Sequence, residues 1–380
     1  MVDQDYQAYP EELELEDTHQ YLVDVRNLKM HFPITQGLFA RVKGFTRAVD
    51  DVSFTIHRGE TLGLVGESGC GKTTVGRCIV RAYRPTGGEI LYYEAENLEE
   101  NLKKLRVHVR HFKAQDGISQ GHAIDLTGLS GADLKPYRRE IRMIFQDPYS
   151  SLNPRMTVFE NISEALLVNG MGTRSEMKDR VGYLLQRVGL RPEYMVRYPH
   201  AFSGGERQRV VIARALVTNP RLIIADEAVS ALDVSVRAQI LNLLEELQAD
   251  FELTYLFISH DLSVIRHICD RVIVMYVGKV VEIAEGLDIY TNPKHPYTEA
   301  LMSSVPISNP RHRQRTERIH LKGEVADPSN PPSGCYFHPR CQYAQERCRV
   351  EEPPLIGLGN GHYAACHFAE ELSLRGAVMG

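Results

Sequence analysis

Short apolar runs alternate with longer amphipathic segments along most of this chain. Runs of four or five consecutive apolar residues are typical of strands buried on both faces, whereas apolar positions three and four residues apart are typical of helices. Strands are expected at residues 21–25, 48–56, 61–65, 222–225 and 255–258, and helical periodicity runs through residues 158–188, 204–215 and 234–249. This order of strands and helices predicts an α/β fold with a parallel core.

The pattern also divides the chain into parts. Residues 1–20 are acidic and are expected to form an N-terminal arm, followed by a main domain over residues 21–290 with a helical subdomain at about 150–220. The pattern breaks at about residues 93–125, where a charged stretch and a glycine-containing loop predict a surface insertion. Proline and polar residues increase from residue 291, which predicts a smaller extension over residues 291–380.

The insertion contains a basic stretch formed by Lys103, Lys104, Arg106, Arg110 and Lys113. Charge runs usually form a solvated face. Leu102, Leu105 and Phe112 lie among these basic residues, which leaves a partner-binding helix as the alternative.

Composition narrows the class of protein. The 380 residues are 43% hydrophobic and 24% charged, which is ordinary for a globular protein, and the net charge of −5 argues against general nucleic-acid coating. No segment approaches eighteen consecutive apolar residues, and the acidic start lacks the features of a secretory signal. We therefore expect an intracellular protein that associates with a membrane only through partners.

The first chemical motif follows the apolar run at residues 61–65. Residues 66–74, Gly-Glu-Ser-Gly-Cys-Gly-Lys-Thr-Thr, match the P-loop pattern GxxxxGK(S/T), in which backbone N–H groups converge on phosphate oxygens at a helix N-terminus. Lys72 supplies a charge for the β and γ phosphates, and Thr73 supplies a hydroxyl ligand for Mg²⁺. The residues expected to bind ATP here are Gly66, Glu67, Ser68, Gly69, Cys70, Gly71, Lys72, Thr73 and Thr74.

A pair of carboxylates ends a second apolar run. Residues 222–225 are apolar and lead directly into Asp226 and Glu227. Asp226 is expected to hold Mg²⁺ through water, and Glu227 is expected to polarise the water that attacks the γ-phosphate.

The most diagnostic stretch is residues 203–208, Ser-Gly-Gly-Glu-Arg-Gln, which begins about twenty residues before Asp226. At the start of a helix, a serine hydroxyl and free backbone N–H groups offer a second anion site. The residues expected to form this site are Ser203, Gly204, Gly205 and Glu206.

Together these motifs resemble the ABC transporter ATPase family. The resemblance implies a RecA-like core with an antiparallel β subdomain and a helical subdomain, and it adds three residues: Gln146 of the Q-loop, which also touches Mg²⁺, Asp233 of the D-loop and His260 as the switch histidine. Glu227, His260 and Gln146 are the expected catalytic residues. The resemblance also implies that two ATP molecules lie between two such subunits, each held by Lys72-type residues of one subunit and Ser203-type residues of the other.

The family stacks adenine on an aromatic residue ahead of the P-loop. Phe32 lies near the expected place, and Phe39 and Phe45 are alternatives. Packing of Phe32 in the core is the non-functional interpretation.

Longer phrases resemble the oligopeptide/dipeptide importer branch, and in particular its F-type ATPase subunit. They are Gln-Asp-Pro-Tyr-Ser-Ser-Leu-Asn-Pro at 146–154, Ser-Ala-Leu-Asp-Val-Ser at 230–235, Tyr-Leu-Phe-Ile-Ser-His-Asp-Leu-Ser at 255–263 and Asn-Pro-Lys-His-Pro-Tyr-Thr at 292–298. The resemblance implies a D-type ATPase partner, two permeases and an extracytoplasmic solute-binding protein, at the cytoplasmic face of the inner membrane. Sugars, nickel or other solutes are alternatives to peptides. The chain departs from the pattern at the insertion, at Ala228, and at Phe202 and Glu206 within the signature turn.

Four cysteines lie together near the C-terminus: Cys335, Cys341, Cys348 and Cys366, separated by five, six and seventeen residues. This spacing lacks the short knuckle of structural zinc sites. Four thiolates suit a [4Fe–4S] cluster, which members of the importer branch carry in this tail. Zinc and unligated cysteines remain alternatives, His338, His362 and His367 are expected to be loop residues, and Cys70, Cys78 and Cys269 are expected to be core residues.

The alternative function is that of a soluble ABC ATPase in DNA or ribosome maintenance, because the catalytic motifs do not themselves indicate transport. The chain has one ATPase cassette, no long coiled coil and a net negative charge, all of which favour the importer subunit, with no nucleic acid expected as a partner.

Overall fold

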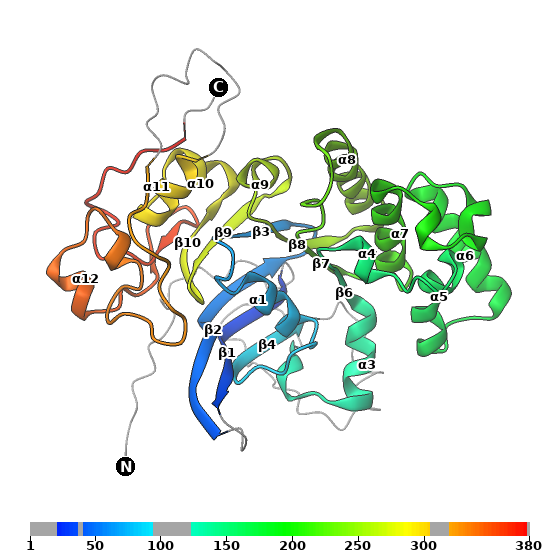
Figure 1. The fold of residues 1–380 in the computed structure, drawn as a ribbon, viewed down its shortest axis with the longest axis horizontal. Helices are drawn as coiled ribbons and strands as arrows, with labels where there is room; N and C mark the ends of the chain where they lie inside the picture. The colour runs from blue at the N-terminus through cyan, green and yellow to red at the C-terminus, as the bar shows by residue number, and fades with distance from the viewer. Residues whose placement is uncertain (1–20, 37–40, 94–122, 305–318, 378–380) are drawn as a thin grey trace, which may run out of the picture.

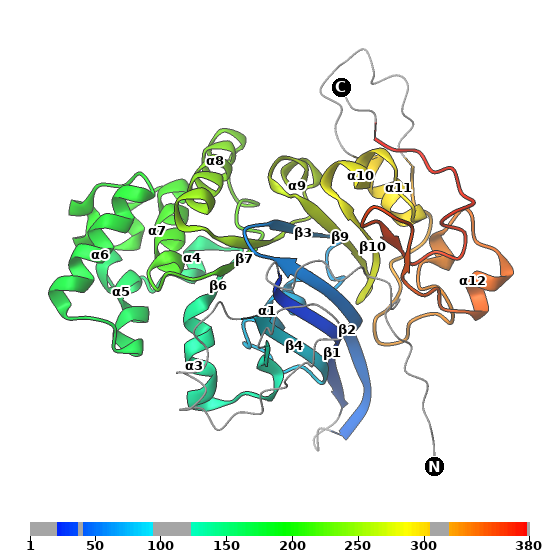
Figure 2. The same cartoon turned by 180° about the vertical axis from the view of Figure 1, so that it is seen from behind.

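Two β-sheets organise the structure, which is a computed structural model describing residues 21–36, 41–93, 123–304 and 319–377. The larger sheet has the strand order β11-β12-β10-β9-β3-β8-β7-β6, and the smaller has the order β2-β1-β4-β5. Figures 1 and 2 show the small sheet beneath the centre of the large one, the helices α4 to α7 gathered at one end, and the C-terminal segments at the other. The P-loop helix α1 (Lys72–Ile79) lies where the two sheets meet.

The centre of the large sheet is parallel and buried. Its parallel strands are β6 (Ile141–Ile144), β7 (Leu222–Asp226), β8 (Thr254–Ile258), β3 (Thr61–Val65) and β9 (Arg271–Tyr276). Every residue of β3, β7 and β8 is buried, which is why the sequence shows these strands as continuous apolar runs. Strand β10 (Lys279–Glu285) pairs antiparallel with β9. The expected α/β core is confirmed.

The small antiparallel sheet is larger than the alternation predicted. Its strands are β1 (Tyr21–Gln36), β2 (Arg41–His57), β4 (Gly87–Tyr93) and β5 (Ala123–Asp125). The predicted segments at 21–25 and 48–56 are only the inner parts of β1 and β2. The outer part of β1 continues the alternation at Leu28, Met30, Phe32 and Ile34, a signal that the strand prediction did not use. Residues 41–47 of β2 are mostly exposed and lack a regular apolar alternation.

The expected insertion begins and ends in paired strands. Tyr93 of β4 pairs with Ala123 of β5. Residues 94–122, including the basic stretch, and the expected arm at 1–20 lie outside the described residues.

Helices cover the large sheet and form the helical group beside it. The covering helices include α8 (Val234–Phe251), α9 (Leu262–Ile268), α10 (Gly286–Thr291) and α11 (Pro296–Met302), and α3 (Gly131–Glu140) precedes β6. The helical group comprises α4 (Pro148–Ser151), α5 (Val158–Asn169), α6 (Arg174–Arg187), η3 (Pro192–Val196), η4 (Pro199–Ala201) and α7 (Gly204–Leu216). Thr157 and Thr173 begin α5 and α6 with capping boxes, so the helical periodicity predicted over residues 158–188 belongs to two separate helices. None of the helices in the described residues combines the length and apolarity needed to span a bilayer.

The C-terminal segments add to the large sheet. Strands β11 (Ile356–Gly357) and β12 (Tyr363–Ala364) extend it beyond β10, and η6 (His338–Arg340) and α12 (Glu346–Val350) lie outside it. The fully buried carboxylate of Glu282 accepts hydrogen bonds from the backbone N–H groups of Lys294 and His295 and pairs with His362 at 2.8 Å. His362 lies outside the helices and strands, as expected of a loop residue, but it is buried and links β10 to the extension through Glu282.

Candidate nucleotide site

The P-loop has the backbone that its glycines predict. Gly66, Gly69 and Gly71 all have positive φ angles, of 149°, 83° and 108°. A Cβ atom at Gly66 would lie 2.2 Å from the Met275 carbonyl oxygen, and one at Gly71 would lie 2.1 Å from the Ala48 carbonyl oxygen. Only glycine fits at these two positions, because the clashing atoms belong to the backbone.

Lys72 is buried at the start of α1 and bonds to its own loop. Its ammonium group donates to the carbonyl oxygens of Gly66 at 2.7 Å and Glu67 at 2.9 Å. The charge of Lys72 is thereby held inside the loop whose amides are expected to bind phosphate. Ser68, Cys70 and Thr74 belong to the same loop and first helical turn.

Thr73 and Asp226 lie together, as the magnesium site requires. The Thr73 hydroxyl donates to the Asp226 carboxylate at 2.8 Å. Asp226 is 3% exposed at the end of β7, and burial raises the pKa of its carboxyl group above the usual range. A hydroxyl and a carboxylate are hard oxygen ligands, so this pair fits Mg²⁺.

The three expected catalytic side chains meet at one carboxylate. The Gln146 side-chain amide donates to Glu227 at 2.7 Å, and His260 Nδ1 lies 3.0 Å from the other Glu227 oxygen. These residues follow β6, β7 and β8, whose carboxyl ends share one edge of the parallel sheet. Ser230 contributes a contact that the sequence analysis did not assign: its hydroxyl donates to the Glu227 carbonyl at 3.0 Å. Asp233, from the same D-loop, is exposed at the start of α8.

The signature turn starts α7 with a capping box. The Ser203 N–H and hydroxyl donate to the Glu206 carboxylate at 2.9 Å and 2.8 Å, and the Glu206 N–H donates to the Ser203 oxygen at 3.3 Å. These bonds to Ser203 lower the pKa of Glu206. Gly204 and Gly205 form the first turn, and a Cβ atom at Gly205 would lie 2.6 Å from a methyl group of Val236. The turn forms as expected, but Ser203 is already bonded to an anionic side chain of its own chain.

The aromatic candidates for adenine stacking differ in exposure. Phe32 is partly buried and makes an edge contact with Tyr83 at a ring separation of 5.5 Å. Phe45 is 50% exposed and lines an open hollow with His31, Arg47, Asp50 and Ser329. Phe39 lies outside the described residues. Stacking on Phe32 stays a prediction.

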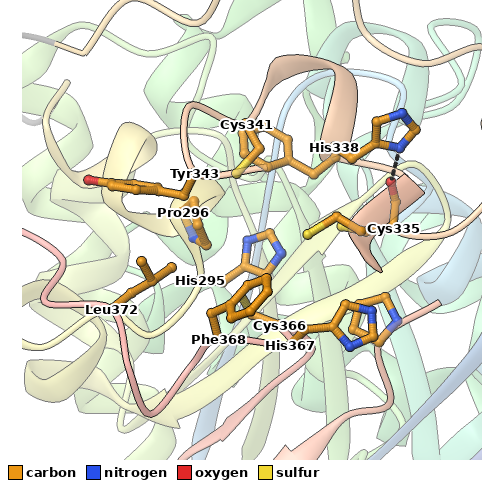
Figure 3. A pocket seen from close by; sticks show the side chains of 13 residues that line it. His295, Pro296, Cys335, His338, Cys341, Tyr343, Cys366, His367, Phe368 and Leu372 are labelled. Carbon is orange, nitrogen blue, oxygen red and sulfur yellow. Dashed lines mark hydrogen bonds between the residues drawn. The ribbon is translucent and has the colours of Figure 1, made fainter. Parts of the chain in front are cut away.

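The four C-terminal cysteines line one cavity. Figure 3 shows the side chains of Cys335, Cys341 and Cys366 around a shared space, and Cys348 also lines it. Burial raises the pKa of Cys335 to about 11 and of Cys341 to about 12, and it raises that of Cys366. Cys70 and Cys78 lie in the core as expected, and Cys269 is partly buried.

The cavity does not show the arrangement of a single bound metal ion. Among the described residues, no three His, Cys, Asp or Glu side chains are grouped to hold one ion. Four sulfurs around zinc at 2.3 Å would lie only about 3.8 Å apart, which is the arrangement that is absent here. The four thiols nevertheless line one cavity. The cluster itself stays a prediction.

Two residues that the sequence did not assign to the nucleotide site contact the P-loop. Arg340 forms an ion pair with Glu67, and the Tyr297 hydroxyl accepts a hydrogen bond from the Glu67 N–H. Tyr297 lies in the phrase at 292–298, but nothing in the pattern of that phrase pointed to the nucleotide site.

The P-loop, the Asp226–Glu227 pair and the capped turn of α7 define an ATPase of the ABC type. Residues 49–230 match the family model described as ABC transporter, and residues 281–348 match that of the oligopeptide/dipeptide transporter C-terminal region. The chain is 50% identical over 347 residues to the oligopeptide transport ATP-binding protein AppF of Bacillus subtilis, covering 91% of this chain and 97% of that protein. It is 44% identical to the dipeptide transport ATP-binding protein DppF of Haemophilus influenzae, covering 91% and 96%.

Comparison with a solved structure also identifies the fold as that of an ATP-binding cassette. The ATP-binding cassette MJ0796, in a dimeric post-hydrolysis state bound to ADP and phosphate, is 26% identical with a TM-score of 0.55, covering 70% of this chain and 98% of that one. This chain therefore belongs to the ABC transporter family, among the ATP-binding proteins that carry the oligopeptide/dipeptide transporter C-terminal region. ATP hydrolysis is the activity of this class.

Proposed function

We propose that this chain is the ATP-hydrolysing subunit that powers peptide import across the cytoplasmic membrane. The observation that carries the proposal is the convergence of Gln146 and His260 on Glu227, in a chain whose relatives over its whole core are named as oligopeptide and dipeptide transport proteins. The C-terminal match at 281–348 supports the same branch.

Within the site, each side chain has a part in hydrolysis. Lys72 moves from the carbonyl oxygens of its loop to the β and γ phosphates when ATP enters, while the loop amides hold the phosphate chain. Glu227 accepts a hydrogen bond from the attacking water, and Gln146 and His260 fix the direction of its carboxylate. Thr73, Asp226 and Gln146 would hold Mg²⁺, which would supply positive charge beside the phosphates.

The proposal includes a second ATPase subunit. Ser203, Gly204 and Gly205 stand at a helix N-terminus, an arrangement suited to the phosphates of an ATP bound mainly by another subunit. The F-type resemblance favours a different, D-type chain as that subunit. ATP binding closes the pair, and hydrolysis and release reopen it.

Exposed aromatic residues in the helical group support contact with permeases. Tyr149 is 62% exposed beneath the Arg207 guanidinium, 4.0 Å from its ring, and Arg207 also donates to the Pro199 carbonyl at 2.8 Å. Tyr198 is 44% exposed next to this site. Tyr149 lies three residues after Gln146 in the chain. Movement would pass through the Gln146 loop to two permeases, which would anchor the chain peripherally at the cytoplasmic face.

The four-cysteine cavity is assigned to a [4Fe–4S] cluster. Four thiols on one cavity support this assignment, and the raised pKa values mean that ligand binding must displace protons. The site is separate from the expected position of ATP, so the cluster is given no step in hydrolysis.

Isolation of the intact complex tests the function. We expect this chain to copurify with two integral membrane proteins and a second ATPase, and a peptide-loaded solute-binding protein should stimulate ATP hydrolysis. Stimulation by sugars or nickel but not by peptides would change the substrate. A chain that remains soluble and copurifies with nucleic acid or ribosomes instead would establish the alternative function.

A further inference from the structure

Arg340 of the C-terminal extension forms an ion pair with Glu67, the second residue of the P-loop. Arg340 Nη1 donates to one Glu67 carboxylate oxygen at 2.7 Å, and Nη2 donates to the other at 3.1 Å. The Arg340 side chain is 7% exposed, although Glu67 is more accessible. A bidentate pair of this kind fixes orientation as well as distance.

The backbone of the same residue is held by the extension too. The Glu67 N–H donates to the Tyr297 hydroxyl at 2.8 Å. Tyr297 is fully buried, with its ring 4.8 Å from that of Tyr276 and 5.4 Å from that of Phe337. Because burial and the contacts with these two rings restrict the Tyr297 ring, its hydroxyl is a fixed acceptor.

The contacts of Glu67 also affect Lys72, whose ammonium group is expected to bind the phosphates of ATP. The Glu67 carbonyl accepts one of the two hydrogen bonds that hold Lys72. Glu67 is therefore restrained at its side chain and at its N–H, while its carbonyl restrains the phosphate-binding lysine. The conformation of the loop before ATP arrives depends on residues about 230 and 273 positions away in sequence.

The arginine is itself held in a short, constrained loop. Phe337 and Arg340 both lie between Cys335 and Cys341, which line the four-cysteine cavity. Phe337 is buried against Tyr276 at a ring separation of 5.2 Å. One face of this loop contributes to the cavity, and its arginine reaches the P-loop.

We propose that Arg340 is a positioning residue for nucleotide binding, through which the C-terminal extension holds the P-loop in its ATP-accepting conformation. The proposal rests on ATP binding at Lys72 but not on the identity of the transported solute. Since a preorganised loop binds more tightly than one that must be ordered, loss of the pair should weaken ATP binding more than the subsequent hydrolysis step.

Equilibrium titration of the purified full-length chain with a fluorescent ATP analogue tests this proposal. We expect R340Q and E67Q each to raise the Kd by about tenfold, and the double variant to raise it no further, because each single change already breaks the pair. R340K should recover part of the affinity by restoring the charge without the bidentate geometry. In the assembled complex, R340Q should raise KM for ATP while kcat stays within about threefold.

Arg271 provides a matched control. It pairs with Glu60 at 3.2 Å in another partly buried ion pair, at the opposite ends of β3 and β9 from the P-loop. R271Q should lower the unfolding temperature but leave the Kd unchanged. An unchanged Kd in R340Q and E67Q, additive effects in the double variant, or an equal rise in R271Q would overturn the proposal. Wild-type protein that binds no ATP would overturn the proposed function as well, whereas wild-type binding with an unaffected R340Q removes only the positioning role.

Discussion

His260 Nδ1 lies 3.0 Å from the Glu227 carboxylate, although 33 positions separate the two residues in sequence. The contact joins the ends of two neighbouring parallel strands, β7 and β8. Gln146 donates to the second carboxylate oxygen from the end of β6. Gln146 and His260 therefore fix the orientation of the Glu227 carboxylate, each through one of its two oxygens, without bound ATP.

Replacing Glu227 by glutamine should separate binding from hydrolysis. The amide keeps the shape of the side chain but is a much weaker acceptor for the attacking water, so we expect the ATPase rate of the assembled complex to fall by at least about 10²-fold. ATP binding should persist. Glu246→Gln, at an exposed position on α8, is the control for loss of one negative charge and should retain activity. Unchanged steady-state hydrolysis in Glu227→Gln would remove Glu227 from its proposed role.

His260→Ala should lower kcat with a smaller effect on ATP affinity. The imidazole orients Glu227 from an exposed position, so its removal leaves Gln146 as the one described side chain that holds this carboxylate. We expect a decrease of roughly 10–10²-fold in single-turnover hydrolysis. A change confined to the ATP Kd would instead make His260 a binding residue.

Asp226→Asn should stabilise the protein without nucleotide. Burial raises the pKa of Asp226 above its unfolded value, so the folded state binds more protons than the unfolded state between these two values. The buried Asp226 charge therefore lowers the free energy of unfolding by its full amount at neutral pH. This destabilisation decreases as the pH falls through the pKa of Asp226 in the folded state. The asparagine can still accept the Thr73 hydrogen bond, and each 1 kcal/mol regained raises the unfolding temperature by roughly 2–4 °C.

The measurement is thermal unfolding of both proteins from pH 7 down to about pH 4. The gain of Asp226→Asn should be largest at pH 7, and the further stabilisation that Mg-ATP gives wild type should be lost. If Asp226→Asn were less stable than wild type at every pH, the buried Asp226 charge would not be a source of destabilisation.

Glu206→Gln should strengthen the signature site. Glutamine can replace glutamate in the capping box, so α7 keeps its start, while a negative charge is removed beside the turn proposed to meet the partner's ATP. A unit charge at about 4 Å in water contributes about 1 kcal/mol, so KM for ATP in the complex should fall by up to about fivefold. Glu176→Gln, in the equivalent capping box of α6, is the control and should leave KM unchanged.

Metal analysis decides the four-cysteine cavity. Protein purified without oxygen should contain about four irons and absorb broadly near ~400 nm, and both signals should be lost in Cys348→Ser. Cys78→Ser, in the core away from the cavity, should retain them. Stoichiometric zinc without iron, or no metal at all, would contradict the cluster.

The sequence was most informative where chemistry is local. Gly66 and Gly71 must be glycine because backbone oxygens lie beside them, so the loop pattern alone carries its conformation. The buried strand β3 was predicted at its observed bounds for a similar reason, since all five residues are buried.

Contacts between distant segments could not be predicted from such patterns. The pair formed by Arg340 and Glu67 depends on how the extension folds back onto the P-loop, and neither residue lies in a periodic or charged pattern that marks it. Likewise, His362 has the sequence context of a loop residue, and only the burial of Glu282 explains its position. The capping box of Ser203, in contrast, follows a local sequence pattern, in which serine is followed three positions later by glutamate, so its partner Glu206 is predictable from the sequence.

The pairing of Tyr93 with Ala123 has a consequence for protein engineering. The backbone leaves the small sheet at Tyr93 and rejoins it at Ala123, and these two residues are paired on neighbouring strands. Closing a flexible connection costs only about 0.6 kcal/mol more for each doubling of its length. A reporter module placed between Tyr93 and Ala123 would therefore enter and leave the small sheet at paired positions and would leave both chain ends untouched.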